Sequence, residues 1–324
     1  MPPQPLTWSK SNKNYTLFGT TLAMPPQRFS SQNRPLVLLF DIGGVCVASP
    51  MAAIAHYERT HNIPKGYINV AISTSGKNGS WAKLERGEVA LDSDFFKTFG
   101  QDLMNEKVWR EYYAKSLASK QGVRSQSQAV EEAVFQAPAP PAIDAEELYW
   151  SMMAESRQLD AWMWPALQRL RKVADEGGLQ GGQRLVLGAL SNTSIFPKGH
   201  AYNDPTTEEG RRQAELRGIF DVFVSSAHVG LRKPDRGIYE LAVRLLDERV
   251  KGKGGVGVEA GDVVFLDDIG TNLRTGRQVG MRTIKVELGR AWKAVRELEG
   301  VTGLELLEEG ERKRLGEGGE RAKL

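Results

Sequence analysis

The stretch from Leu36 to Val45 constrains the fold of this chain more than any other. Five apolar residues, Leu36–Phe40, run into Asp41, and Gly43 and Gly44 follow at once. A short continuous apolar run predicts a strand that is buried on both faces of a sheet. The glycines predict a sharp turn, or a close approach of a ligand to the backbone, at the end of that strand. Because ligands bind beyond the carboxyl ends of strands in open α/β sheets, Asp41 is a candidate functional residue, although a turn-capping aspartate would give the same pattern.

The composition is that of a globular protein with a large core. The 324 residues carry a net charge of +3, and 40% of them are hydrophobic and 26% charged. We find no basic stripe that would indicate nucleic-acid binding and no apolar run near the roughly 20 residues of a membrane span. Cys46 is the only cysteine, so no intrachain disulfide can form, and a cytoplasmic location is favoured over secretion. Its apolar neighbours predict a small buried side chain.

The first 34 residues differ from the rest of the chain. They contain basic residues but no acidic ones, and they are rich in serine, threonine, asparagine and proline. This composition predicts a disordered extension. It also leaves a mitochondrial targeting segment open, although prolines at positions 2, 3 and 5 oppose an amphipathic helix there.

Residues 51–160 show helical patterns and no convincing buried strand, which predicts an α-helical module inserted after the first strand. Asp92 is a candidate N-cap of one of its helices. Residues 120–145 include the run Ala137–Pro141 and are typical of a low-complexity surface insertion or linker.

Strands and helices alternate in the second half of the chain. The predicted strands cover residues 184–190, 221–224, 263–266 and 282–286, and the predicted helices cover 235–247 and 272–279. This alternation predicts a doubly wound parallel sheet with right-handed crossovers. We therefore expect an α/β core from residues 35–50 and 161–300, with the helical insertion at 51–160. Residues 301–324 form a charged C-terminal tail, and its part from Glu308 onward is expected to be a fraying helix or disordered.

Polar side chains follow three of the predicted strands, at the point where each strand ends. They are Asp41, Ser191 and the pair Asp267 and Asp268, and Lys233 precedes a proline at a helix start. Because parallel strands end at one edge of the sheet, these groups could converge there. Oxygen ligands of this kind suit Mg²⁺, an aspartate can carry a phosphoryl group, and a lysine can offset its charge. Taken singly, each residue also has an ordinary structural explanation, as a strand-end hydroxyl, an exposed lysine or a capping carboxylate.

Four segments together resemble, in order, the four motifs of the haloacid dehalogenase-like (HAD) hydrolase superfamily. They are residues 40–45, 190–193, 229–235 with Ile238 and Tyr239, and 264–273. The first motif alone is weak, but the last is long and specific, and the likeness spans roughly residues 35 to 290. Within the superfamily, the chain is most similar to the phosphatase-type N-terminal domain of soluble epoxide hydrolase and to related domains fused to acyl-CoA dehydrogenases.

The resemblance implies a role for each matched residue. Asp41 would be the nucleophile, and Ser191 would hydrogen-bond the transferring group. Lys233 would offset the negative charge of the nucleophile and of the phosphate. The implied Mg²⁺ ligands are Asp41, the backbone carbonyl of Gly43, Asp267 and Asp268, and the implied phosphate-binding and supporting residues are Asn192, Gly43, Gly44 and Asn272. Which of Asp267 and Asp268 contacts the metal directly stays open. The helical insertion would be the cap that closes over the site and selects the substrate.

Gly43 is the main departure from the superfamily pattern. Phosphatases of this superfamily usually carry a second aspartate at this position, which acts as general acid and base. A glycine still supplies the backbone carbonyl to the metal, but the acid/base group is lost. Such a loss typically costs about 10² to 10⁴ in rate. The loss would slow the hydrolysis of acyl phosphates, aryl phosphates or a C–X bond least.

The resulting hypothesis is a Mg²⁺-dependent HAD-like hydrolase that acts on a small phosphorylated or acidic metabolite through an aspartyl-phosphate on Asp41. Gly43 favours one alternative, a catalytically weak ligand-binding or regulatory protein. Another alternative is hydrolytic dehalogenation, but haloacid dehalogenases need no metal, so the Asp267–Asp268 pair counts against it. Neither the substrate nor the oligomeric state follows from the sequence.

Overall fold

The computed structural model describes residues 34–120 and 134–321, with the side chains of residue 120 and residues 316–321 left out. The predicted extension at 1–34 therefore lies outside the described residues except for Arg34. The predicted low-complexity segment at 120–145 is described only at its first residue and from residue 134 onward.

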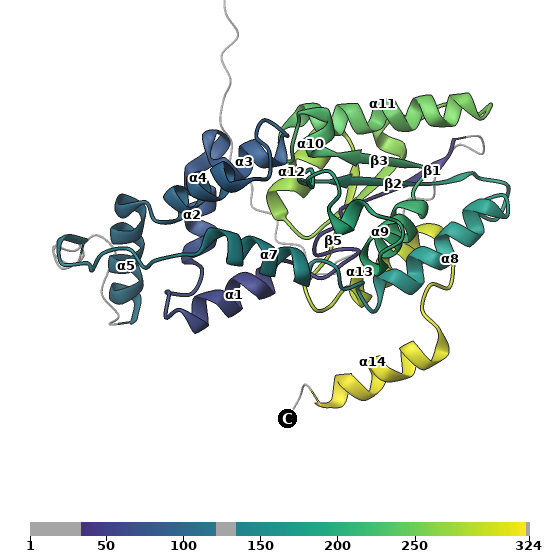
Figure 1. Cartoon of the computed structure of the whole chain (residues 1–324). Helices are drawn as coiled ribbons and strands as arrows, with labels where there is room; N and C mark the ends of the chain where they lie inside the picture. The colour runs from purple at the N-terminus through teal and green to yellow at the C-terminus, as the bar shows by residue number, and fades with distance from the viewer. Residues whose placement is uncertain (1–33, 121–133, 322–324) are drawn as a thin grey trace, which may run out of the picture. The chain divides into compact units, whose positions relative to one another are not determined.

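In the described part of the chain, five strands form one sheet in the order β3-β2-β1-β4-β5 (Figure 1). The strands are β1 (Leu36–Phe40), β2 (Leu185–Ser191), β3 (Val222–Ser225), β4 (Val263–Asp267) and β5 (Arg282–Lys285). Every neighbouring pair is parallel, which confirms the predicted doubly wound α/β fold. The central strand β1 pairs with β2 on one side and β4 on the other, so the ends of these three strands lie together at one edge.

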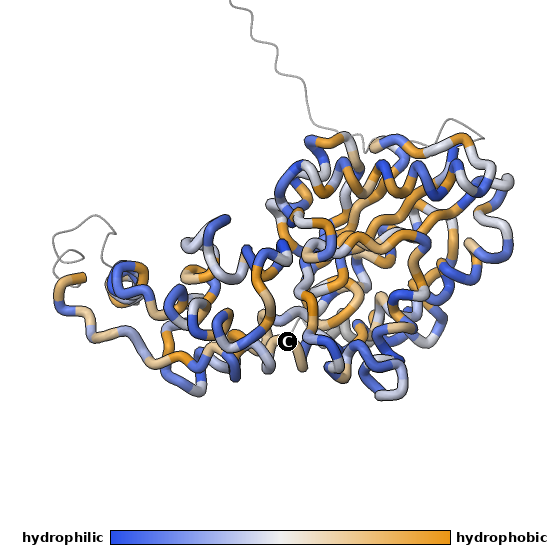
Figure 2. Tube along the Cα trace, turned by 45° about the horizontal axis from the view of Figure 1, so that its top comes forward, coloured by the Kyte–Doolittle hydropathy of each residue, from blue (hydrophilic) through white to orange (hydrophobic). Residues whose placement is uncertain are grey.

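The strands are apolar because helices cover both faces of the sheet. All five residues of β1 are fully buried, and Figure 2 shows hydrophobic residues concentrated along the strands. On one face, Val37 and Leu39 share a core with Tyr239 of α11 (Arg236–Gly252) and Leu273 of α12 (Gly270–Val279). On the other face, α8 (Met163–Asp175) packs against β2 and α13 (Trp292–Thr302) packs against α8. This double cover explains why the strands read as continuous apolar runs.

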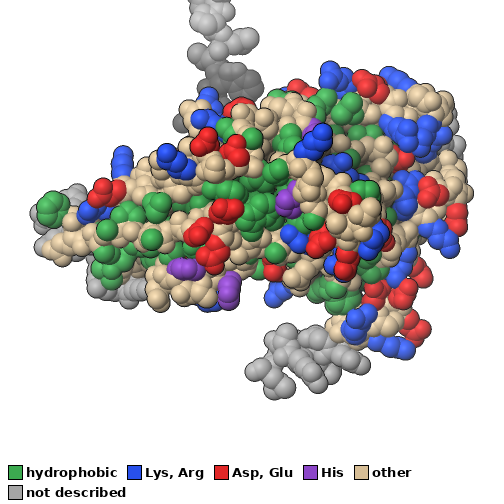
Figure 3. Space-filling view, viewed as in Figure 1, with side chains coloured by type: hydrophobic (Ala, Val, Ile, Leu, Met, Phe, Trp, Pro, Cys, Tyr) green, Lys and Arg blue, Asp and Glu red, His purple; other side chains and the backbone are tan. Residues whose placement is uncertain are grey.

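Residues 51–155, which we call the helical insert, lie between β1 and β2 and have a core of their own. The described helices are α1 (Met51–Thr60), α2 (Tyr67–Ser75), η1 (Gly76–Asn78), α3 (Ser80–Glu85), α4 (Ser93–Leu103), α5 (Glu106–Lys120) and α7 (Ala145–Glu155). Aromatic residues including Tyr67, Phe95, Phe99 and Tyr149 form the centre of this second core. Figure 3 shows that hydrophobic side chains also reach the surface of the helical insert among charged ones. The Asp92 carboxylate accepts a hydrogen bond from the backbone of Phe95, as expected of an N-cap.

The remaining elements complete the sheet domain. They are η2 (Ala201–Asn203), α9 (Glu208–Gly218), α10 (Ser226–Val229), η3 (Ala260–Asp262) and α14 (Glu309–Arg321). Beyond α13, Leu306 and Leu307 are buried, and Glu311 in α14 pairs with Arg169 at 3.3 Å. Among the described helices, none combines the length and the apolar character that crossing a membrane requires.

Candidate active site

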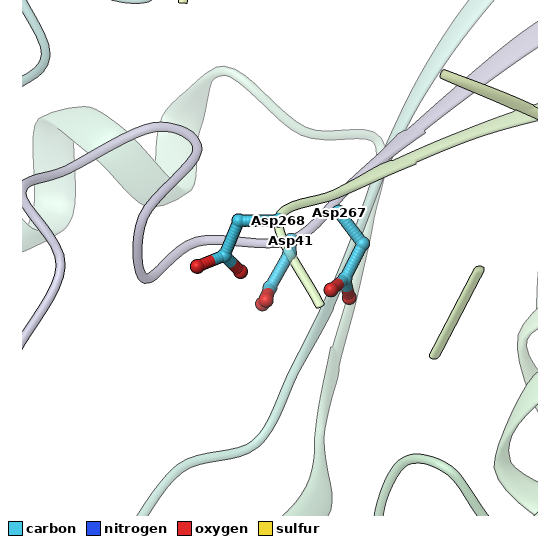
Figure 4. Close-up of side chains that lie close together, drawn as sticks. All are labelled: Asp41, Asp267 and Asp268. Carbon is cyan, nitrogen blue, oxygen red and sulfur yellow. The ribbon is translucent and has the colours of Figure 1, made fainter. Parts of the chain in front are cut away.

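Three carboxylates meet at the ends of two neighbouring strands. Asp41 follows β1 directly, Asp267 is the last residue of β4, and Asp268 comes next. One oxygen atom of each lies within 4.8 Å of the others (Figure 4). Because Phe40 pairs with Leu266 across the two strands, the polar residues that follow are brought side by side. The sheet therefore assembles the carboxylates that the sequence motifs single out.

Lys233 lies between two of these carboxylates. Its Nζ atom is 2.7 Å from Asp41 Oδ1 and 2.7 Å from Asp267 Oδ2. The lysine is only 1% exposed. Burial alone would lower the pKa of Lys233, but Asp41 and Asp267 together raise it above its ordinary value. The site thus holds a buried ammonium that stays charged at neutral pH.

Two hydrogen-bond donors besides Lys233 fix Asp267. The side-chain amide of Asn272 donates to both carboxylate oxygens at 3.1 Å, and the backbone N–H of Ile269 donates to Oδ1 at 2.8 Å. Asn272 comes from the first turn of α12 and contacts Asp267 directly. Asp267 is fully buried, and these partners satisfy a charge that would otherwise be costly there.

The carboxylate of Asp268 has fewer hydrogen-bond partners than that of Asp267. Its Oδ1 atom is buried and has no hydrogen-bond partner among the described residues. Burial raises the pKa of Asp268 to about 6, and the nearby charge of Asp267 adds to this effect. Burial likewise raises the pKa of Asp41, with help from Asp267 and Asp268 and against the opposing effect of Lys233. A divalent cation bound by oxygen ligands would relieve both groups.

Ser191 and Asn192 stand at the end of β2, next to β1. Ser191 is buried and pairs in register with Ser225 of β3. The side chain of Asn192 is occupied by the backbone of Lys233: its Oδ1 accepts from the Lys233 N–H at 2.8 Å and its Nδ2 donates to the Lys233 carbonyl at 3.1 Å. The sequence indicates a phosphate-binding role for the backbone of Asn192, but it did not indicate that the side chain fixes the lysine.

Gly43 and Gly44 form the turn after Asp41 and differ in how much space each leaves for a side chain. A Cβ atom at Gly43 would meet nothing within 4 Å, and no described residue donates a hydrogen bond to its backbone carbonyl. Gly44 has a φ of 75°, and a Cβ there would lie 2.6 Å from Asp268 Oδ2. Glycine is therefore needed at position 44, whereas position 43 has room for a side chain.

A cavity of about 890 Å³ opens beside this edge of the sheet. Its walls include Gly43, Ser191 and Asn192 from the sheet domain and Trp81 and Glu85 from the helical insert. Lys83 and Arg86, which lie next to these insert residues in the sequence, do not line the cavity, and Arg86 pairs with Glu88 at 2.6 Å. A substrate in the cavity would therefore be enclosed by both parts of the chain.

One contact near the site escaped the sequence analysis. Glu85 of the helical insert and Arg232, the residue before Lys233, form an ion pair at 2.5 Å. The two residues are 147 positions apart, so no local pattern signals their contact. Cys46, by contrast, is buried as predicted, and its thiol donates to the Asp41 carbonyl at 3.1 Å.

No protein-family model matches the chain, but curated relatives do. The chain is 28% identical over 274 residues to bifunctional epoxide hydrolase 2 of Sus scrofa, which covers 83% of this chain and 39% of that protein. It is 26% identical over 272 residues to acyl-CoA dehydrogenase family member 10 of Mus musculus, with coverages of 83% and 19%. Over a shorter stretch of 94 residues, identity to bifunctional epoxide hydrolase 2 of Mus musculus reaches 43%, with coverages of 29% and 15%. The chain thus spans well under half the length of these relatives.

Solved structures with similar chains include a HAD family enzyme of Bacteroides thetaiotaomicron in complex with magnesium and inorganic phosphate. It is 13% identical, covers 81% of this chain and 98% of its own, and has a TM-score of 0.42, which is a weak overall similarity.

These sequence relatives support the resemblance to the haloacid dehalogenase-like superfamily that the motifs predict. The two kinds of relative that the motifs suggested, epoxide hydrolase and acyl-CoA dehydrogenase proteins, are both among the proteins that its sequence resembles.

Proposed function

We propose that this chain is a Mg²⁺-dependent HAD hydrolase that cleaves a small phosphorylated metabolite through an aspartyl-phosphate on Asp41. The observation that carries the proposal is the position of Lys233, which bridges Asp41 and Asp267 at 2.7 Å from each. A buried ammonium between two carboxylates, with a third carboxylate beside them, matches what transfer of an anionic phosphoryl group requires.

The residues present fit a Mg²⁺ ion. Asp41, Asp267 and Asp268 offer oxygen atoms within 4.8 Å of one another, and the unpaired buried Oδ1 of Asp268 lacks the partner that an ion would provide. The free backbone carbonyl of Gly43 is a further candidate ligand. When bound, the ion would offset the negative charge of the carboxylates and of the phosphoryl oxygens.

The hydrogen bonds of Asp41 support its proposed role as the nucleophile. Its Oδ1 atom accepts from the Ile42 N–H and from Lys233, both at 2.7 Å, whereas no described residue donates to Oδ2. In the first step Oδ2 attacks phosphorus, the bond from phosphorus to the leaving oxygen breaks, and the leaving group departs with the electron pair as an oxyanion. A basic leaving group then takes up a proton from water. In this proposal Lys233 offsets the charge of the attacked group, and the hydroxyl of Ser191, which is buried at the end of β2, donates a hydrogen bond to it.

In the second step water attacks phosphorus, the bond from phosphorus to Asp41 breaks, and phosphate and the free carboxylate are released. The attacking water must lose a proton to solvent in the second step, and a basic leaving group must gain one in the first, but position 43 supplies no side chain for either transfer. Leaving groups that depart without a proton, such as aryl and acyl phosphates, are therefore the best substrates by this reasoning.

The proposal is tested with para-nitrophenyl phosphate and Mg²⁺. We expect turnover by the native chain, loss of turnover in Asp41→Asn, and loss on removal of Mg²⁺ with EDTA. Asp247→Asn is the control, because this carboxylate pairs with Lys251 and accepts from the Val258 N–H, contacts none of the site residues and should leave turnover unchanged. Unchanged turnover in Asp41→Asn would exclude the proposed nucleophile. Release of chloride from a haloacid in the presence of EDTA would instead support dehalogenation.

A further inference from the structure

A buried ion pair joins the helical insert to the segment that carries Lys233. Glu85 ends α3, and its Oε2 accepts from Arg232 Nε at 2.7 Å and from Arg232 Nη2 at 2.5 Å. The two side chains are 11% and 24% exposed. Burial raises the pKa of Glu85, and the Arg232 guanidinium opposes that rise. Because two N–H groups of the guanidinium donate to the same carboxylate, they fix the orientation of Arg232 as well as its distance from Glu85.

The backbone around Glu85 is docked on the sheet domain as well. The Glu85 carbonyl accepts from Ser226 Oγ at 2.5 Å, and the same Oγ accepts from the Thr193 N–H at 2.8 Å. Two residues further on, Gly87 has a φ of 65°, and a Cβ there would lie 2.2 Å from the Ala227 carbonyl oxygen. The end of α3 therefore approaches the sheet domain so closely that only glycine fits.

Lys233 is consequently held from two sides. Asn192 at the end of β2 holds its backbone N–H and carbonyl, and Glu85 holds the preceding residue, Arg232. These two anchors determine where the lysine side chain starts, and its Nζ then reaches both Asp41 and Asp267 at 2.7 Å. One of the two anchors belongs to the helical insert.

We propose that Glu85 is a positioning residue that acts through Arg232, so that docking of the helical insert places the ammonium of Lys233 against Asp41. The inference rests on the proposed function, because it takes Lys233 as part of the reaction. It makes the insert more than a cover over the cavity: an undocked insert would leave the lysine misplaced and the site inactive. Displacing a reacting group by about 1 Å can cost about 10²-fold in rate.

The experiment compares Glu85→Gln, Arg232→Gln and the double variant in the full chain. We expect each single variant to lower kcat by about 10- to 100-fold and to change KM by less than about threefold, because the lost interaction positions the lysine and does not contact substrate. The double variant should be no worse than either single one, since both changes break the same pair. Arg232→Lys should recover part of kcat, because a lysine keeps the charge but not the fork.

Arg171→Gln is the matched control. Arg171 and Asp221 form a pair of similar burial, 19% and 9% exposed and 3.1 Å apart, that contacts none of the site residues. We expect it to lower the melting temperature as much as Arg232→Gln does and to leave kcat unchanged. Unchanged kcat in both Glu85→Gln and Arg232→Gln would overturn the inference. So would a loss in Glu85→Gln alone that grows with the basicity of the leaving group, because that pattern marks a proton donor.

A second readout does not depend on activity. Labelling of Lys233 with an amine-reactive acetylating reagent, followed by mass spectrometry, reports its exposure, which is 1% in the native chain. We expect faster labelling in Glu85→Gln and Arg232→Gln and no change in Arg171→Gln. Unchanged labelling in the first two variants would overturn the inference even where the phosphatase assay had already failed, so the two failures can be told apart.

Discussion

Lys233 Nζ lies 2.7 Å from Asp41 Oδ1 in a setting where the lysine is 1% exposed and the aspartate 6% exposed. A buried ion pair is costly to break on one side only, because the remaining charge is then left unpaired in a medium of low dielectric constant. This relationship affects folding stability as well as catalysis.

The first prediction concerns Lys233→Met. Removing the ammonium leaves Asp41 and Asp267 as buried carboxylates without their counter-charge. Above about pH 8, where Asp41 is ionised, the free energy of unfolding should therefore fall by about 3–5 kcal/mol in the absence of Mg²⁺. Turnover should be lost as well. Urea denaturation measures the change, and Lys293→Met is the control: it breaks a pair with Glu287 at the same 2.7 Å but 37% and 45% exposed. The control should cost no more than about 1 kcal/mol. Equal stability of the two variants would mean that the buried pair does not hold the site together.

The second prediction concerns pH and Mg²⁺. An unfolded aspartate has an ordinary pKa of 3.8, whereas the pKa of Asp41 in the fold is about 8 and that of Asp268 about 6, raised chiefly by burial. Between these values the folded chain binds more protons than the unfolded chain, so the free energy of unfolding of the metal-free protein should fall as pH rises from about 4 to about 8. Mg²⁺ stabilises the ionised carboxylates, so the rise in melting temperature that it produces should grow with pH across the same window.

Thermal denaturation at several pH values, with and without Mg²⁺, checks this directly. Asp41→Asn is the informative variant, because it removes the carboxyl group whose pKa is raised more than that of Asp268, and it should flatten the pH dependence of the metal-free protein. A Mg²⁺ effect of equal size at low and high pH would contradict a site made of these carboxylates.

Much of the sheet could be predicted because its strands are buried on both faces. Leu36–Phe40 and Val263–Leu266 are apolar at every position, and a parallel sheet covered by helices leaves no polar face to interrupt such runs. The predicted strand at 184–190 ends one residue early, since β2 continues through Ser191. Backbone pairing of Ser191 with Ser225 extends the strand beyond the point where hydrophobicity stops indicating it.

The site was predictable only in part, because some of its contacts join residues that are far apart in the sequence. Asp41, Ser191 and Asp267 follow strands, so parallel pairing brings them to one edge without further information. The contact of Glu85 with Arg232 depends instead on how the helical insert docks, and nothing near either residue in the sequence encodes it. The orientation of Asn192 toward the backbone of Lys233 is likewise set by the loop that carries the lysine.

The third prediction compares the two glycines after Asp41. Gly44→Ala adds a Cβ 2.6 Å from Asp268 Oδ2 at a φ of 75°, so it should destabilise the fold by about 1–3 kcal/mol and weaken Mg²⁺ binding by about tenfold or more. Gly43→Ala is the matched control: its Cβ meets nothing within 4 Å, and it should change neither quantity measurably. Calorimetric titration with Mg²⁺ and urea denaturation give the two readouts. Similar effects of the two substitutions would show that Asp268 does not depend on the close approach of Gly44.

The fourth prediction restores the side chain that position 43 lacks. The open space around Gly43 accommodates an aspartate, two residues beyond the proposed nucleophile. If a missing acid/base group limits the reaction, Gly43→Asp should raise kcat/KM on alkyl phosphates by about 10²-fold or more, and by much less on aryl phosphates, whose leaving groups depart without a proton. Gly43→Asn is the control, because it has the same shape and cannot transfer a proton. An equal rise in both variants would assign the effect to packing. No rise in Gly43→Asp would mean that the site is adapted to another leaving group, or that another residue at the cavity wall already supplies the proton.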